Sequence, residues 1–344
     1  MEKIAFISGG TFVYWSSIIL TLAAATALII FAAAYLFKGG SMVSCSVLVS
    51  LAMVGSIMLS RLIHWYCRSD AYESLEAAMT DYTRGNYALM GVFVACIAVA
   101  ALLRIIRVIR NLPATYDCMA IAGGIGIGVG RLASLFNASN RGMILPDSVG
   151  LPFAYPVVNT VSGVTENRLA TFMIQALIVG GIVAALILYL LIMKIAKKKV
   201  KDGDVALMFL LAYGASQIIC DSTRYDSLFL RSNGFISVVQ ILGLVALVVP
   251  IVVFSVRTVK NMGIKWQLFV FWAVILGMMG LAGYMEYYVQ RHGNEAAFAY
   301  SLMATGLIAI VLLTLVIRAM GSYAGKKKAL VEALAEELTA VQAD

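Results

Sequence analysis

Residues 169–193 read LATFMIQALIVGGIVAALILYLLIM and contain no acidic or basic side chain, and Lys194 follows directly. About 20 mainly apolar residues are enough for a helix to cross the hydrocarbon core of a bilayer. This stretch therefore predicts a membrane-spanning helix that ends in a basic segment. The composition supports this interpretation, because 62% of the 344 residues are hydrophobic and 13% are charged. Together with a mean hydropathy of +0.92, these values exclude a soluble globular domain.

Similar apolar stretches occur on both sides of this segment. We predict an all-α fold from them, a polytopic membrane bundle of about nine transmembrane helices. The predicted spans cover residues 11–37, 41–66, 87–103, 116–130, 169–193, 205–220, 232–256, 266–285 and 297–317.

Basic residues predict the orientation of these spans. They cluster at every second end of the series, and cytoplasmic segments of membrane proteins are enriched in Lys and Arg. One orientation places every cluster inside, with the N-terminus outside, the C-terminus in the cytoplasm and the longest polar connection, residues 131–168, facing outward. The same bias explains most of the net charge of +8, so we predict no nucleic-acid partner. The clusters are Lys38, Arg104 with Arg107 and Arg110, the lysines of residues 194–201, Arg257 with Lys260 and Lys265, and Arg318 with residues 326–328.

The chain divides into three predicted parts. Residues 1–260 form a seven-span core, residues 261–320 contribute two further spans, and residues 321–344 form a cytoplasmic tail. Apolar residues of the tail share one side of a helix, which predicts an amphipathic helix that is solvated or lies among headgroups rather than a specific docking motif. These residues are Leu330, Leu334, Leu338 and Val341.

Cysteine and histidine spacing gives no sign of a metal site. The two histidines and five cysteines are scattered, without a CxxC pair or a His/Cys/Asp cluster. We therefore predict no metal, no cofactor and no disulfide framework.

Charged side chains at membrane depth are candidates for function. Each costs about 2.5–3.5 kcal/mol to insert, and such residues usually face a bundle interior or a wet cavity. The candidates are Arg61, His64, Asp117, Arg131, Asp221 and Arg224.

The sixth predicted span carries a polar stripe. Tyr213, Gln217, Asp221 and Arg224 follow one another at offsets of four, four and three, which places them on one helix face and indicates a polar cavity. The alternative is an Asp221–Arg224 pair that reaches the outer headgroups and anchors the helix.

The fourth predicted span ends in GGIGIGVGR, residues 123–131. An arginine offers phosphate oxygens a planar fork of donors, so Arg131 suits an anionic lipid headgroup. The alternative is that the glycines serve close helix packing and the arginine reaches the interface. A P-loop is excluded, because no GK[ST] follows.

The second predicted span ends in Arg61 and His64, one turn apart, followed by Trp65 and Tyr66. An aromatic pair is typical of a membrane interface, so this group indicates an anchor. The alternative is that His64, with an ordinary pKa of about 6.5, accepts a proton.

The string GVGRLASLFNASNRG, residues 128–142, resembles the signature GRxGNFxNxExxG of the prolipoprotein diacylglyceryl transferase family. Gly130, Arg131, Asn137 and Gly142 match this signature. The string LPFAYP, residues 151–156, is similar to the PFA segment that follows in the family.

Three further segments carry the same resemblance. LLAYGASQIICDSTRYD, residues 210–226, resembles the helix YGxFRxxxExxR and keeps Tyr213 and Arg224, with Asp221 in place of the Glu. Residues 233–247 resemble the stretch that follows, and SRL, residues 60–62, resembles the family's GGRxG. The resemblance extends over residues 11–257.

Besides Asp221, the chain departs from the family pattern at four positions. Ser134 and Ser139 replace the first Asn and the Glu of the signature, and Gln217 replaces an Arg. Leu89 aligns with the histidine of the outward-facing HGG element that is implicated in the family's activity.

The resemblance implies a reaction. Members move a diacylglyceryl group from phosphatidylglycerol to the thiol of a lipobox cysteine and release glycerol phosphate, at the outer face of the bacterial cytoplasmic membrane. It implies phosphatidylglycerol or another anionic phospholipid and a lipobox-containing precursor protein as partners. We expect Arg131 to hold the phosphate and His64 or Asp221 to favour the thiolate, because these residues lie near the predicted outer end of the bundle, so the expected catalytic residues are Arg131, Asp221 and His64. The expected substrate-binding residues are Arg61, Asn137, Tyr213, Gln217, Arg224, Gly130 and Gly142.

The four departures leave two other functions open. One is a non-catalytic relative that binds an anionic lipid or a partner protein, since a fold can outlast its function. The other is a transporter or channel, which polar residues inside the membrane would also suit.

Overall fold

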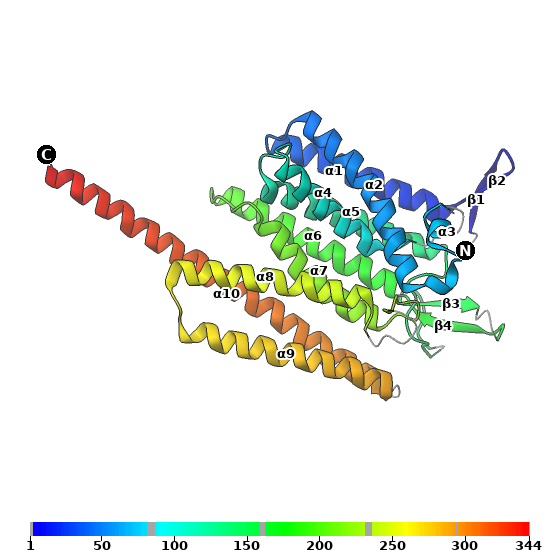
Figure 1. Ribbon diagram of the computed structural model, residues 1–344. Coiled ribbons are helices and arrows are strands. Elements are labelled where there is room, and N and C mark those ends of the chain that lie inside the picture. Colours follow the sequence, from blue (N-terminus) through cyan, green and yellow to red (C-terminus); the bar gives the residue numbers. More distant parts are fainter. Residues whose placement is uncertain are drawn as a thin grey trace. The chain divides into compact units, whose positions relative to one another are not determined.

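The computed structural model describes residues 3–80, 87–146, 148–158, 162–230, 236–292 and 295–343, and it confirms the predicted polytopic helical bundle (Figure 1). Eight of the described helices are long and apolar enough to cross a membrane, and α4 is a shorter apolar helix of 17 residues. The long helices are α1 Trp15–Phe37, α2 Met42–Cys67, α5 Leu112–Arg131, α6 Thr171–Ile195, α7 Asp204–Ser222, α8 Val238–Met262, α9 Trp266–Arg291 and α10 Ala296–Ala343. The shorter elements are α3 Leu75–Thr80, α4 Leu89–Ile105, the 3-10 turns η1 Ser69–Ala71 and η3 Leu132–Leu135, and the strands β1 Ile4–Ser8, β2 Thr11–Tyr14, β3 Ala154–Val158 and β4 Thr165–Leu169.

Two of the long helices, α2 and α5, begin where the sequence supplies a side-chain cap. The side chain of Ser41 accepts a hydrogen bond from the Ser44 amide at the start of α2, and Asn111 does the same for Ala114 at the start of α5. Such caps satisfy backbone donors that have no partner in the first helical turn. The cap at Asn111 starts α5 four residues before the predicted residue 116.

The prediction that the first span begins at residue 11 is wrong. Residues 11–14 form β2, which pairs with β1 in an antiparallel hairpin, and α1 begins only at Trp15. The boundary between β2 and α1 cannot be recognised from hydropathy, because the strand and the start of the helix are both apolar.

By its internal contacts the chain forms two units, Met1–Gly243 and Leu244–Asp344. In the first unit, α1 packs on α5, α2 on α4, and α6 and α7 on α5. Small residues allow the closest approaches, since a Cβ at Gly91 would lie 2.3 Å from the Cα of Ser60, and one at Gly126 would lie 2.8 Å from the Cβ of Ala27. The glycine-rich end of α5 is therefore used for helix packing.

Asp117, one of the charged residues at membrane depth, has a structural role. Its buried carboxylate accepts hydrogen bonds from the amides of Gly203 and Ala206, both at 2.9 Å, at the N-terminus of α7. Lys38 lies 3.3 Å from the same carboxylate. The negative charge thus caps the positive end of the α7 dipole.

The second unit contains most of α8 together with α9 and α10. Trp272 on α9 donates to the hydroxyl of Ser255 on α8, and Thr258 and Asn261 of α8 donate to backbone carbonyls of α10. α10 continues without a break to Ala343, so residues of the predicted tail belong to the same helix as the last predicted span.

Candidate functional site

Arg131 ends α5 and connects to the loop that follows. Its Nη1 donates to the side-chain oxygen of Asn140 at 2.7 Å. The Asn140 amide nitrogen in turn donates to Ser134 Oγ at 3.0 Å and more weakly to Ser139 Oγ at 3.3 Å. Asn140 has a φ of 55°, a left-handed conformation that asparagine tolerates better than most residues. It therefore links the end of α5 to both serines of the loop.

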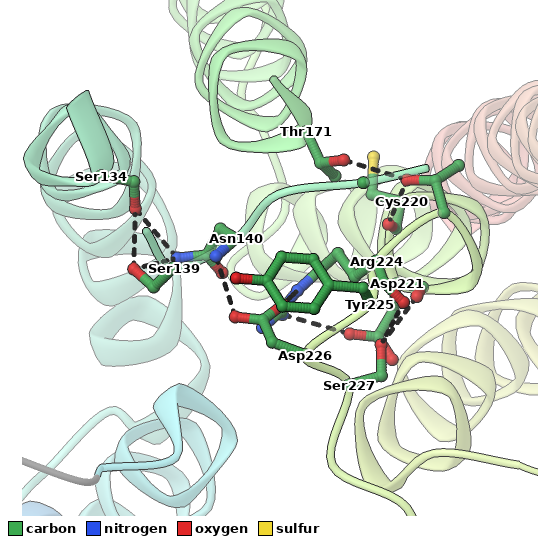
Figure 2. A network of polar contacts seen from close by, with 12 residues as sticks. Ser134, Ser139, Asn140, Thr171, Cys220, Asp221, Arg224, Tyr225, Asp226 and Ser227 are labelled. Carbon is green, nitrogen blue, oxygen red and sulfur yellow. Dashed lines mark hydrogen bonds and ion pairs between the residues drawn. The ribbon is translucent and has the colours of Figure 1, made fainter. Parts of the chain in front are cut away.

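Beyond α7, a second loop meets the first one (Figure 2). Arg224 binds Asp221 through Nη1 at 3.2 Å and Asp226 through Nε at 2.9 Å. The other oxygen of Asp226 accepts the backbone N–H of Asn140 at 2.9 Å. One chain of contacts thus joins Arg131 to Asp221, and we call the end of the bundle where α5 and α7 finish the site end.

The charge of Arg224 is neutralised within this chain of contacts. Burial lowers the pKa of Arg224, but the carboxylates of Asp226 and Asp221 more than offset burial and raise it above its ordinary value. Among the described residues, Arg131 has no carboxylate within salt-bridge distance. Arg131 is therefore the better candidate for an anionic ligand.

Asp221 is fully engaged by protein groups. Its side chain is 0% exposed, and besides Arg224 it accepts a hydrogen bond from the Ser237 hydroxyl. The Asp221–Arg224 pair lies inside the bundle rather than on its surface, with Arg224 itself only 12% exposed. A pair held in this way fixes the end of α7 more readily than it accepts a proton.

The rest of the predicted stripe faces the interior beside Arg131. The ring of Tyr213 stacks on Phe209 at 5.3 Å, and Gln217 accepts a hydrogen bond from Gln175 of α6 at 3.4 Å. The Arg131 guanidinium interacts electrostatically with the Tyr213 hydroxyl. Among the described residues, the Tyr213 hydroxyl and Arg131 Nε make no well-formed hydrogen bond but lie close enough to interact with each other, and Gln175 Oε1 is buried without a partner. Gln175 Oε1 therefore has capacity for the polar group of a ligand.

Arg141 stabilises the loop after α5 through hydrogen bonds to its backbone. It is buried, and its Nη2 donates to the backbone oxygens of Ser134 at 2.8 Å and Asn137 at 3.1 Å. Its guanidinium lies over the rings of Phe172 and Tyr155, at 4.4 and 4.9 Å from their centroids. Burial lowers the pKa of Arg141, but an arginine keeps its charge at neutral pH.

The other matched signature residues shape the loop. Asn137 accepts hydrogen bonds from the amide and hydroxyl of Ser139. Gly142 donates to the Leu169 carbonyl at 2.8 Å, and a Cβ there would lie 2.6 Å from Thr171 Oγ1. Gly130 faces α1, where its neighbours are Ala23 and Leu20. Gly142 therefore serves close packing, whereas a Cβ at Gly130 would make only ordinary contacts, 3.6 and 3.7 Å from these two side chains.

Arg61 and His64 form a separate group. Arg61 is 1% exposed, donates from Nε to the Ala78 carbonyl and lies over the Tyr87 ring at 5.2 Å. His64 Nδ1 is 2.9 Å from the Tyr72 hydroxyl. A pocket of about 310 Å³ lies beside Arg61, lined by Val54, Ile57, Met58, Arg61 and Met79. No described contact joins this group to Arg131, so the structure does not bring all three predicted catalytic residues together.

Three residues of the network escaped the sequence-based prediction, namely Asn140, Arg141 and Asp226. Asn140 and Arg141 lie inside the string that carries the resemblance, and Asp226 is two residues beyond Arg224. Arg141 and Asp226 are charged and lie close in sequence to predicted site residues, and this was the one signal in the sequence that could have identified them. Among the described residues, no group of three or more His, Cys, Asp or Glu side chains has the geometry of a metal site.

Comparisons with known proteins complete this description. No curated protein matches the chain. The sequence model of the prolipoprotein diacylglyceryl transferase family matches residues 3–256, which include α1 to α7 and most of α8. The match contains the whole network around Arg131 and covers well over half of the chain. This membrane protein therefore belongs to the prolipoprotein diacylglyceryl transferase family.

Proposed function

We propose that the protein transfers the diacylglyceryl group of phosphatidylglycerol to the cysteine thiol of a lipobox-containing precursor, at the outer face of a bacterial cytoplasmic membrane. Family membership supports a transferase of this type. The observation that carries the proposal is Arg131, a cation at the site end that lacks a carboxylate partner among the described residues. A monoanionic phosphodiester supplies the missing negative charge.

The reaction needs a group that stabilises a leaving phosphate. The thiolate sulfur attacks the glyceryl carbon bonded to the phosphate oxygen, an S–C bond forms, and the C–O bond breaks. The electron pair leaves with the glycerol phosphate, whose charge the Arg131 fork stabilises as it develops. Arg224, held by Asp221 and Asp226, then acts as a positioning residue for the loop that carries Asn140.

The acceptor thiol must lose its proton. Asp221 is occupied by Arg224 and Ser237, and His64 lies in the separate group with Tyr72. We propose that the positive charges of Arg131 and Arg141 favour the thiolate and that solvent takes the proton, because cations lower the pKa of a nearby thiol.

This proposal predicts the pH dependence of transfer. If the thiol ionises without a protein base, kcat/KM rises about tenfold per pH unit and levels at the pKa of the thiol. The pKa of an unperturbed cysteine is about 8.5, and nearby cations lower it. If His64 takes the proton, the profile levels once the imidazole is neutral, at or below the ordinary histidine pKa of about 6.5. We expect the first profile, unchanged in His64→Ala. A plateau in this acidic range that His64→Ala abolishes would restore His64 as the base.

Product analysis tests the proposed function directly. The reconstituted protein, given phosphatidylglycerol with labelled acyl chains and a lipobox peptide, is expected to form a thioether-linked diacylglyceryl peptide and free glycerol phosphate, both seen by mass spectrometry. A peptide with Ser in place of the cysteine is the control, and phosphatidylethanolamine as the donor tests headgroup choice. Release of labelled lipid without a thioether product would contradict the proposal.

A second candidate is a non-catalytic relative that binds an anionic lipid. Two departures favour it, Leu89 where the family has a histidine and Ser139 where it has a Glu. Leu89 is the first residue of α4 and supplies no titratable group. Binding of phosphatidylglycerol in the same vesicles, with no thioether product over many hours, would support this candidate.

A further inference from the structure

The β1–β2 hairpin precedes the first membrane helix and has a tight turn. Ser8 pairs with Thr11, Ile7 with Phe12, and Phe6 with Val13. Gly9 and Gly10 form the two-residue connection with φ values of 57° and 80°, which only glycine adopts readily and which suits a type I′ turn. The geometry of this segment is therefore specified locally.

Both faces of the hairpin carry apolar side chains, and the polar pair Ser8 and Thr11 lies next to the turn. Residues paired across antiparallel strands lie on the same face, and successive residues lie on opposite faces. Ile7 and Phe12, 63% and 52% exposed, form one face, while Phe6, 53% exposed, forms the other with Val13. One protein surface covers only one face of a ribbon. Since exposed apolar side chains lie on both faces, a lipid environment suits the hairpin better than a single protein surface does.

The hairpin is continuous with a surface that already faces lipid. α1 begins directly after β2, and the amide of Trp15 donates to the Lys3 carbonyl at 3.1 Å. Exposed apolar residues continue along α1, including Leu20 and Ile29. Tyr14 and Trp15 at the junction are also exposed, and such aromatic residues are typical of the boundary between membrane and water. The hairpin therefore starts at that boundary.

The hairpin also adjoins the site. The ring of Trp15 lies 6.0 Å from that of Phe136, which directly precedes Asn137. α1 also contacts η3, the turn that follows Arg131. Figure 1 shows β1–β2 at the same end of the first unit as β3–β4.

We propose that β1–β2 inserts both of its apolar faces into the interfacial layer of the membrane at the site end, so that its partner is a lipid surface. Side chains such as Ile7 and Phe12 gain from immersion among headgroups and upper acyl chains, while the backbone edges keep access to interfacial water. Through Trp15 and Phe136, the inserted hairpin sets the depth at which the loop after Arg131 meets the leaflet. The proposal does not depend on the reaction proposed above.

Fluorescence quenching tests the insertion. Ile7→Cys and Phe6→Cys place a label on opposite faces, and Glu73→Cys, an exposed residue between η1 and α3, is the aqueous control. Each variant is labelled with an environment-sensitive dye in vesicles of phosphatidylcholine and phosphatidylglycerol, and labelled wild type gives the background from the native cysteines. We expect doxyl lipids to quench both hairpin labels at least about twofold more than iodide does, with the reverse order at residue 73.

Two outcomes would overturn the insertion. Stronger quenching by iodide on both faces would mean that the hairpin stands in water. Protection of one face from both quenchers would mean that protein covers it, either another part of this chain or a second copy. Each variant must unfold thermally at the wild-type midpoint, which we expect because the substituted side chains are exposed.

Discussion

Arg131→Gln is expected to lower the rate of diacylglyceryl transfer by about 100-fold or more, the usual loss when one preorganised donor to a developing charge is removed. Glutamine keeps polarity but has neither the charge nor the fork of donors. Arg131→Lys keeps the charge alone and should retain part of the rate, since an ammonium cannot bind phosphate oxygens in the bidentate manner. Initial rates with labelled phosphatidylglycerol measure both effects.

Two further variants serve as comparisons for Arg131→Gln, one for the hydrogen bond of Arg131 and one for its position in the bundle. Asn140→Ala removes the partner of Arg131 Nη1 and leaves the guanidinium in place, so we expect a smaller loss than for Arg131→Gln. Arg110→Gln removes an exposed arginine from the opposite end of the bundle and should leave the rate unchanged. If Arg131→Gln binds lipid and turns over within about twofold of wild type, Arg131 does not hold the phosphate.

Arg224→Gln is expected to destabilise the protein by about 3–5 kcal/mol, because it leaves the buried carboxylate of Asp221 without its cation. The second carboxylate, Asp226, is 25% exposed and is expected to contribute less to this loss. The free energy of unfolding in mixed detergent micelles measures the effect.

A double variant tests whether the pair is coupled. Asp221→Asn combined with Arg224→Gln removes both charges, and we expect it to be more stable than Arg224→Gln alone. If the stability loss of the double variant equals the sum of the losses of the two single variants, the stability of Asp221 does not depend on Arg224. Since Asp226 also holds the backbone of Asn140, Arg224→Gln should lower transfer even at temperatures where the protein is folded.

The helices were predictable because their signal is local. A run of apolar residues such as 169–193 predicts a span whatever surrounds it, and α6 occupies Thr171–Ile195. The stripe of Tyr213, Gln217 and Asp221 follows from helical periodicity, and all three side chains are buried in α7. The Gly9–Gly10 turn was also a local signal, but the apolar run from residue 11 onward concealed the strand that follows it.

The site could be predicted only in part, because its contacts join distant segments. Asn140 and Asp226 lie 86 positions apart, and nothing in either loop specifies that they meet. His64 was grouped with Arg131 because both end spans on the same side of the membrane. Topology gives the depth of a residue but not its position around the bundle, and the structure places His64 beside Tyr72 instead.

The capping of α7 by Asp117 has a geometric consequence when taken with Asp226. Asp117 joins the start of α5 to the start of α7, and the contact between Asn140 and Asp226 joins the loops that follow the two helices. The two helices must therefore match in length. Each residue of a helix adds about 1.5 Å and 100°. A single deletion in the middle of α7 would shorten the helix and rotate its end, so it cannot leave both joints intact.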